Sequence, residues 1–501
     1  INRCDKILFV KKSRFYKNSK MKRIVFFLSI VSILFISCKD DKFIDSGNLN
    51  LKFSTDTVMF DTVFTTIGTT TRNFTVYNPN NQKIRLKAIY LGKGGESNFA
   101  INVDGQHGPT VSNIEIDKKD SIYIFIEANI DPNRDEMVEK DSIVFESEDS
   151  RSDVKLVAFG QDVILINGQH LSSQTWTSQK PYLIYNYAFV DENNTLTIEA
   201  GTSVHFHYGS SLIVDGTLNV TGSTEQPVVF RSDRLEPFYK DKSGQWGAWI
   251  ETETGAIYLL GGLHFTQKSK NNSIDNAIIE NAIIGIQMDS VQGEHNPGLI
   301  ISNTIIRHMN LIGILAKTSS IESHNLVVND CGMHALSLLL GGNYWFNHAT
   351  IANYTPYTSR TTPAVAIGNY YKYEEQIFVY PLERCNFTNS IIYGKYGNNQ
   401  SELVVDLIEQ NNANYYFDYC ILQATDIDTT DATHFGKIIK TEQGVNFKDI
   451  GKYNFELDTL SPAKDAGLLE YGNLSPLDLK GNSRTTDSKP DLGAYERLEE
   501  K

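Results

Sequence analysis

The sequence reads NAIIEN at 276–281, NTIIRH at 303–308, HNLVVN at 324–329, HATIAN at 348–353, NSIIYG at 389–394 and, more weakly, YCILQA at 419–424. Each piece is a short apolar run that is bracketed mainly by Asn or His. The first positions are separated by 27, 21, 24, 41 and 30 residues. A repeat of roughly 20–30 residues without helical periodicity is typical of one turn of a parallel β-helix. We therefore expect successive coils whose strands pair in parallel.

Equivalent residues of such coils stack at the strand spacing of about 4.8 Å. The third position of each piece is predicted to form an interior apolar ladder. Its members are Ile278, Ile305, Leu326 and Ile391, with Thr350 as the exception. Asn tolerates positive φ, and its amide can bond the backbone at tight bends. We therefore interpret the bracketing residues as structural rather than catalytic, including His308, His324 and His348.

Further motifs flank the repeats. LTIEAGT at 196–202 and GQWGAWI at 244–250 precede them, and the chain end carries SPAKDAG at 461–467 and DLGAYE at 491–496. These stretches resemble the right-handed parallel β-helix proteins found among Bacteroidetes surface lipoproteins, although Ala248 stands where that family usually has Gly. The resemblance spans about residues 160–496 and implies an all-β fold. Pectate lyases, polygalacturonases and many non-enzymes share it, so an activity has to be argued from a site.

The N-terminal stretch carries a targeting pattern. An apolar run at 24–36 follows Met21-Lys22-Arg23, and its 13 residues are fewer than the about 20 that span a bilayer. This pattern is typical of a secretory signal. Cys38 follows, which resembles the lipobox of bacterial lipoproteins and implies acylation, and Lys39-Asp40-Asp41 resembles the export signal of Bacteroidetes surface lipoproteins. The alternative is a generic cleaved signal with a chance cysteine.

The chain is therefore divided into four parts. We expect an upstream extension and signal peptide at 1–37, a lipidated tether at 38–50, a β-sandwich at 51–163, and a right-handed parallel β-helix with a C-terminal capping segment at 164–501. The acyl chains would hold the protein on the outer membrane, exposed at the cell surface.

The stretch 51–163 has the character of strands throughout. FTVY at 74–77, IRLKAI at 84–89 and IYIFI at 122–126 alternate or carry β-branched runs, and NPNN at 78–81 is a turn cluster. About seven short strands favour an immunoglobulin-like β-sandwich. We interpret it as a spacer, with ligand binding by this domain as the alternative.

Composition excludes several classes of protein. The net charge is −14, but the first 37 residues contribute +8, so the remaining 464 residues carry −22. Sequence-independent nucleic-acid binding needs a basic surface, so we expect no nucleic-acid partner. Five cysteines are too few for a disulfide scaffold. Three of them, Cys331, Cys385 and Cys420, cannot all pair within one chain.

Catalytic motifs are weak. No acidic pair recurs at equivalent repeat positions, and Arg307 is expected to form an ion pair with Glu280 one coil away. The polar loop at 231–244 is the best catalytic candidate by composition, but a solvated loop is favoured. His205 and His207 lack an adjacent third metal ligand, so a surface-facing strand is favoured. We predict no catalytic residue, cofactor or metal site; calcium is a possible ligand that no motif supports.

Aromatic residues carry the binding prediction. The chain has 25 Tyr, 26 Phe and 4 Trp, and the 41-residue spacing leaves a Tyr-rich insertion after Asn353. Sugar rings pack their C–H faces on aromatic rings, while amides bind the hydroxyls. Long loops on a rigid scaffold tend to carry function. The candidate ligand-binding residues are Trp246, Trp249, Tyr344, Trp345, Tyr370, Tyr371 and Tyr373.

The favoured function is non-catalytic binding of a polysaccharide or another surface partner. One alternative is a polysaccharide lyase or glycoside hydrolase, which a cluster of acids with Lys or Arg in an open groove would support. The other is a structural subunit of an outer-membrane assembly, which a broad apolar patch would support.

Overall fold

The structure is a computed structural model. It describes residues 43–498 apart from 46, 48, 65–70, 130–137, 252–256, 292–296, 355–359, 396–399, 409–412, 442 and 486–488. The predicted signal peptide and Cys38 therefore lie outside the described residues. The chain divides into two compact units, with the main division between Ala158 and Phe159. The predicted boundary at 163/164 falls between β10, which ends at Gln161, and β11, which begins at Ile164.

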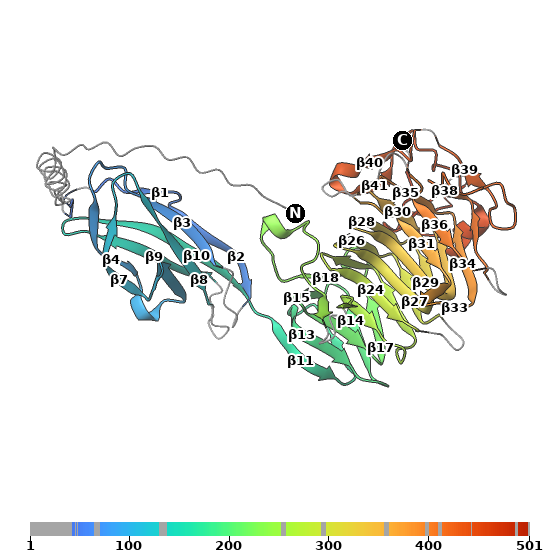
Figure 1. Cartoon of the computed structure of the whole chain (residues 1–501), viewed down its shortest axis with the longest axis horizontal. Coiled ribbons are helices and arrows are strands. Elements are labelled where there is room, and N and C mark those ends of the chain that lie inside the picture. The colour runs from blue at the N-terminus through green and yellow to red at the C-terminus, as the bar shows by residue number, and fades with distance from the viewer. Residues whose placement is uncertain are drawn as a thin grey trace, which may run out of the picture. The chain divides into compact units, whose positions relative to one another are not determined.

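The first unit is a β-sandwich of two five-stranded sheets, and its ten strands exceed the seven expected (Figure 1). One sheet has the order β1 (Lys52–Phe53), β3 (Arg72–Tyr77), β8 (Ser121–Ala128), β5 (Phe99–Val103) and β6 (Gln106–His107). The other has the order β2 (Thr57–Phe64), β10 (Arg151–Gln161), β9 (Val138–Glu146), β4 (Ile84–Leu91) and β7 (Thr110–Ile116).

Alternation of apolar and polar residues gives each sheet one buried face. On β8, Ile122, Ile124 and Ile126 are buried while the residues between them are exposed. Aromatic rings join the sheets: the ring centroids of Phe53 on β1 and Phe145 on β9 lie 4.9 Å apart. The all-β sandwich predicted from the sequence is confirmed.

The second unit is a parallel β-helix with three strand stacks, and the strands of its 25-stranded sheet pair in parallel (Figure 1). Four long strands each contribute to two stacks: β11 (Ile164–Leu171) and β13 (Tyr182–Val190) to stacks 1 and 2, and β27 (Ile312–His324) and β29 (His334–Asn347) to stacks 2 and 3. The chain passes through stacks 1, 2 and 3 in turn, so each circuit adds one coil.

The remaining strands each belong to one stack. Stack 1 contains β15 (Ser203–Phe206), β18 (Val228–Ser232), β23 (Ala277–Glu280), β26 (Ile305–Met309), β28 (Val327–Cys331), β30 (Thr350–Asn353), β35 (Ile391–Gly394), β38 (Cys420–Leu422) and β39 (Ile438–Ile439). Stack 2 contains β16 (Ser211–Val214), β21 (Leu263–Phe265), β24 (Ile284–Asp289), β31 (Val365–Gly368) and β36 (Leu403–Asp406). Stack 3 contains β12 (Gln174–Trp176), β14 (Thr195–Glu199), β17 (Thr217–Thr221), β22 (Asn272–Asp275), β25 (Leu299–Ser302), β34 (Leu382–Thr388) and β37 (Tyr416–Asp418).

The repeat alignment was correct in all but one coil. Ile278, Ile305, Val327, Thr350, Ile391 and Ile421 are register partners in succession. Val327 therefore replaces the predicted Leu326. The ladder also faces outward, contrary to prediction. The interior ladder lies one residue further on, at Phe230, Ile279, Ile306, Val328, Ile351 and Ile392. A shift of one residue exchanges the two faces of a strand.

The bends before stack 1 form the predicted polar column. Their residues have positive φ and are Asn276, Asn303, Asn325, His348, Asn389 and Tyr419. Asn325, rather than the expected His324, occupies the bend. A second column follows stack 1, where Asn281, His308 and Asp330 also have positive φ. The interpretation of these residues as bend formers is confirmed for His308 and His348.

A C-terminal segment, residues 445–498, covers the outward ladder of stack 1. Ile391 and Ile421 are buried against Leu457 and Leu492 of this segment. The hydroxyl oxygen of Thr350 accepts a hydrogen bond of 2.9 Å from the Ala494 N–H, which explains the polar exception in the ladder. The segment contains β40 (Phe447–Asp449), β41 (Asn454–Leu457), η3 (Ile450–Lys452) and α2 (Leu469–Leu474).

Two antiparallel hairpins interrupt the coils: β19 (Ala248–Glu251) with β20 (Ile257–Leu260), and β32 (Tyr370–Tyr373) with β33 (Gln376–Val379). Short 3₁₀ turns are η1 (Gly94–Glu96) and η2 (Pro237–Tyr239). The cysteines Cys331, Cys385 and Cys420 are free and buried. Within the described ranges, no helix is long and apolar enough to cross a membrane.

Candidate functional site

Two of the predicted aromatic contacts belong to the interior. Trp246 is fully buried, stacks on Phe206 with 3.8 Å between ring centroids, and donates its indole N–H to the Glu280 carbonyl oxygen at 2.8 Å. Tyr344 is also fully buried and donates its hydroxyl to the Gly341 carbonyl oxygen at 2.9 Å. Neither ring offers a surface, so we remove both residues from the candidate set. Trp249 lies on β19, and its side chain lies outside the described atoms.

Trp345 lies on the outward face of stack 3 and is half-buried. Its indole N–H donates to the Thr388 hydroxyl at 3.2 Å, and the Arg384 guanidinium lies 5.6 Å from the ring centroid. The ring is therefore held in place by neighbouring coils, with polar groups around it.

The other predicted tyrosines lie on the hairpin β32–β33. Tyr370 donates its hydroxyl to Asp406 at 2.8 Å. Tyr371 and Tyr373 are 42% and 60% exposed, and Tyr371 stacks on Phe378 across the hairpin. Tyr371 and Tyr373 are therefore accessible, and neither lines the cleft between stacks 1 and 2 that is described next.

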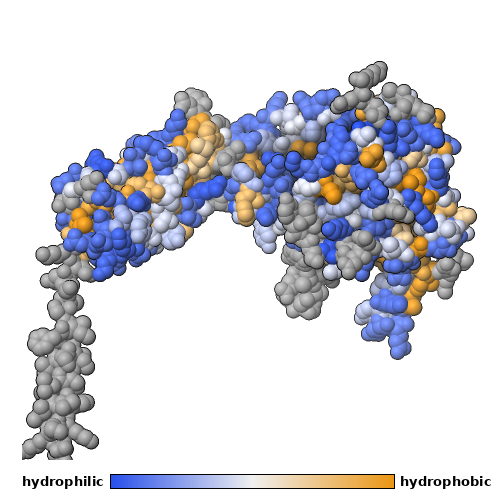
Figure 2. All heavy atoms as spheres, turned by 90° about the horizontal axis from the view of Figure 1, so that it is seen from above, coloured by the Kyte–Doolittle hydropathy of each residue, from blue (hydrophilic) through white to orange (hydrophobic). Residues whose placement is uncertain are grey.

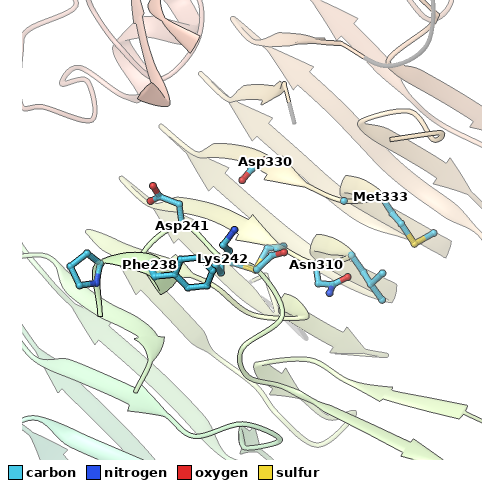
Figure 3. A pocket seen from close by; sticks show the side chains of 11 residues that line it. Phe238, Asp241, Lys242, Asn310, Asp330 and Met333 are labelled. Carbon is cyan, nitrogen blue, oxygen red and sulfur yellow. The ribbon is translucent and has the colours of Figure 1, made fainter. Parts of the chain in front are cut away.

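A cleft lies at the bend between stacks 1 and 2. Its volume is about 670 Å³. One wall comes from the loop between β18 and β19, residues 233–247, here called the cleft loop; the other comes from the bends after β26 and β28. The lining residues are Pro237, Phe238, Asp241, Lys242, Ser243, Met309, Asn310, Leu311, Asp330, Gly332 and Met333. In Figure 3, Phe238, Asp241 and Lys242 lie toward one side, and Asn310 and Met333 toward the other.

The cleft loop is largely exposed to solvent, as expected from the sequence, but its backbone is also anchored to the coil body. The Asn281 side-chain amide donates to the carbonyl oxygens of Lys240 and Lys242, both at 2.9 Å. The Gln245 amide donates to the Tyr239 carbonyl oxygen at 2.8 Å. These two side-chain amides therefore satisfy backbone carbonyls of the loop and hold it against the coil body.

Glycines shape the base of the cleft. A Cβ at Gly332 would lie 2.0 Å from the Asn310 carbonyl oxygen, and a Cβ at Gly244 would lie 2.6 Å from the Asn310 amide nitrogen. Only Gly permits this close approach of loop and coils.

One buried imidazole lies between two cleft carboxylates. His308 is fully buried, and its Nδ1 lies 2.7 Å from Asp330 Oδ2. Its Nε2 lies 3.5 Å from Asp241 Oδ1 and makes no hydrogen bond with any residue that the structure describes. The Asp330 and Asp241 side chains are 15% and 50% exposed, so Asp241 is the more accessible acid.

Aromatic and cationic groups complete the cleft. Phe238 is 70% exposed, which is unusual for a large apolar ring. The Lys242 ammonium lies 5.0 Å from its ring centroid. The cleft thus combines an accessible ring, two carboxylates and the Asn310 amide. The sequence indicated one wall, because the polar loop at 231–244 was its best catalytic candidate. It did not indicate the whole cleft, because the opposite wall comes from bends two and three coils further along the chain.

The other polar candidates make contacts or are buried in ways that are typical of a structural role. The Arg307 guanidinium donates to Glu280 Oε2 at 2.9 and 2.7 Å, which confirms the predicted ion pair. His205 is buried, not surface-facing, and burial lowers its pKa to about 4. His207 lies beyond the strand, with its Nδ1 2.6 Å from Asp233. Among the described residues, no group of three or more His, Cys, Asp or Glu is placed to hold a metal ion.

Figure 2 shows a face on which hydrophilic residues predominate and hydrophobic ones lie in small separate groups. This face does not present the broad apolar patch that an assembly subunit would need.

Comparisons with known proteins add little beyond this geometry. No protein-family model matches the sequence, and no curated protein matches it. One matching solved structure is a family 123 glycoside hydrolase from Clostridium perfringens, described in a study of glycolipid glycan hydrolysis. It is 9% identical, the match covers 22% of this chain and 26% of that chain, and the TM-score is 0.17.

Proposed function

We propose that the β-helix body binds a hydroxyl-rich glycan in the cleft. The observation that carries this proposal is the exposed Phe238 ring beside Asp241, Asp330 and Asn310 on a fixed scaffold. A pyranose C–H face packs on such a ring, and carboxylate and amide groups accept and donate hydrogen bonds to its hydroxyls. Because Asn281 and Gln245 already hold the loop, ligand binding costs little ordering of the protein.

The cellular setting is part of the same proposal. The signal-like run at 24–36 and Cys38 support a lipid anchor in the outer membrane, and the acidic pair after Cys38 supports exposure at the cell surface. The sandwich then serves as a spacer between anchor and binding body. The motifs at 244–250 and 461–496 support membership among right-handed β-helix surface lipoproteins.

A second candidate is a glycoside hydrolase or polysaccharide lyase, and the Asp330–His308–Asp241 arrangement favours it. A carboxyl or imidazole group beside the ligand can transfer a proton to a reacting oxygen. Asp241 is the group in position to do so, because it is half-exposed in the cleft while His308 is enclosed.

The experiment is a glycan panel with the purified protein. Retention of each glycan is measured together with new reducing ends and absorbance from unsaturated products. We expect retention without product, and Phe238→Ala should reduce retention about tenfold, because stacking on an exposed ring is worth about 1–1.5 kcal/mol. Tyr208→Ala is the matched control, since Tyr208 is 72% exposed on the same body but does not line the cleft.

Each outcome decides between the candidates. New reducing ends or unsaturated products that Asp241→Asn abolishes would replace binding with catalysis. Retention that survives Phe238→Ala unchanged would remove the cleft as the binding site.

A further inference from the structure

The cleft carries more negative than positive charge. Asp241 and Asp330 both line it, and Lys242 is the one cation among its lining residues. The Lys242 ammonium lies beside the Phe238 ring, 5.0 Å from the centroid. Residues 38–501 carry a net charge of −22, so the long-range field also favours a cationic ligand over an anionic one.

His308 leaves the Asp241 carboxylate without a hydrogen bond. Its Nδ1 lies 2.7 Å from Asp330 Oδ2, whereas its Nε2 lies 3.5 Å from Asp241 Oδ1 and makes no hydrogen bond with any described residue. Because the Asp241 side chain is half-exposed at the cleft, its carboxylate oxygens are open to a donor from a ligand. A ligand ammonium supplies such a donor together with a positive charge.

The same charges disfavour acidic sugars. A uronate or sulfate group in the cleft would approach both carboxylates, and like charges in one site repel. The Phe238 ring accepts an ammonium at its face, as its contact with Lys242 shows.

We propose that the ligand of the cleft is a glycan that carries free amines, held by Asp241 and Asp330 with its ring against Phe238. This inference rests on the proposed glycan binding and adds the class of sugar.

The test compares ligands that differ only at the nitrogen. Glucosamine oligomers with free amines and their N-acetylated forms of equal length are titrated into the protein at mildly acidic pH, with galacturonate oligomers and oligolysine as further probes. We expect the free-amine oligomers to bind about tenfold more tightly than the acetylated ones, because a charge-assisted hydrogen bond replaces a neutral one.

Variants check the charges in the cleft. Asp241→Asn should lower the affinity for free-amine oligomers about tenfold and should lower the affinity for acetylated oligomers by a smaller factor, since these lose a hydroxyl contact but no ion pair. Lys242→Met should raise the free-amine affinity, because it removes a repelling charge. The matched control is Asp426→Asn, which removes an exposed carboxylate that does not line the cleft. Melting temperatures verify that each variant is folded.

The outcomes separate this inference from the proposed function. Equal or tighter binding of acetylated or galacturonate oligomers would overturn the amine assignment and leave glycan binding intact. Retention of no glycan at all would overturn both, and retention of oligolysine alone would identify the ligand as a basic peptide instead.

Discussion

His308 and His348 are buried histidines at bends on opposite sides of stack 1, and both have positive φ. The Nδ1 of His348 lies 3.2 Å from the Gly493 carbonyl oxygen, and its Nε2 lies 3.1 Å from the Asn389 amide nitrogen. His308 has Asp330 at Nδ1 but only the carboxylate of Asp241 opposite Nε2. The C-terminal segment contacts both bends, through Gly493 at His348 and through Tyr453, whose ring centroid lies 4.5 Å from that of His308, but the second bend also adjoins a cleft. The same kind of positive-φ bend thus has a structural role at His348. At His308 it also places polar side chains where a ligand in the cleft can reach them.

The largest expected effect concerns the His348 side of stack 1, which the C-terminal segment covers. Arg484 is fully buried, pairs with Glu496 at 3.1 Å, and donates to Asn325 Oδ1 at 2.9 Å. Replacing it with Ala removes the charged partner of a buried carboxylate, which costs about 3–5 kcal/mol. Urea denaturation of Arg484→Ala should show this loss in the free energy of unfolding.

The control lies in the same segment. Lys448 pairs with Glu456 at 3.0 Å, but its side chain is 45% exposed. Lys448→Ala should cost less than about 1 kcal/mol. Equal effects of the two variants would show that the segment is not anchored through Arg484.

The pH dependence of stability is the second test of the covered side. Burial holds the pKa of His348 well below its usual value, with nearby Arg484 acting in the same direction. The unfolded chain then binds a proton that the folded state does not, so stability is present above the ordinary histidine pKa and falls as pH drops below it. The slope from this one group approaches about 1.4 kcal/mol per pH unit. Unfolding free energies measured from neutral to mildly acidic pH should show it, and His348→Asn should flatten the curve; an unchanged slope in that variant would contradict the assignment.

The sequence predicted the bends on the His348 side of stack 1 better than it predicted the cleft on the His308 side. The bracketed apolar runs repeat locally, so coil spacing and the Asn column followed from them. The outward direction of the Ile278–Ile391 ladder could not be predicted from these runs. It depends on Leu457 and Leu492, which belong to the C-terminal segment. The cleft depends on Phe238 and Asp241 meeting Asn310 and Asp330 from later coils. Aromatic content alone selected Trp246 and Tyr344, which lie in the core.

The third prediction concerns the open side. His308→Gln removes the imidazole between Asp330 and Asp241, so we expect a loss of about 1–2 kcal/mol in stability from the broken charge-assisted hydrogen bond. We also expect weaker retention of the glycan, because Asp241 loses its fixed neighbour. Retention and unfolding free energy are measured on one preparation and compared with His348→Asn. If His348→Asn reduces retention as much as His308→Gln does, the two bends do not differ in their role in binding.

The smallest expected effect lies on the hairpin β32–β33. Tyr373 is 60% exposed and does not line the cleft, so Tyr373→Ala should change the unfolding free energy by no more than about 0.5 kcal/mol. Retention of the glycan should also stay unchanged, because Tyr373 is not among the residues that line the cleft. Affinity measurements on Tyr373→Ala and Phe238→Ala side by side place the site. If Tyr373→Ala loses binding and Phe238→Ala keeps it, the ligand binds at the exposed hairpin. The difference between the bends at His348 and His308 then has no bearing on function.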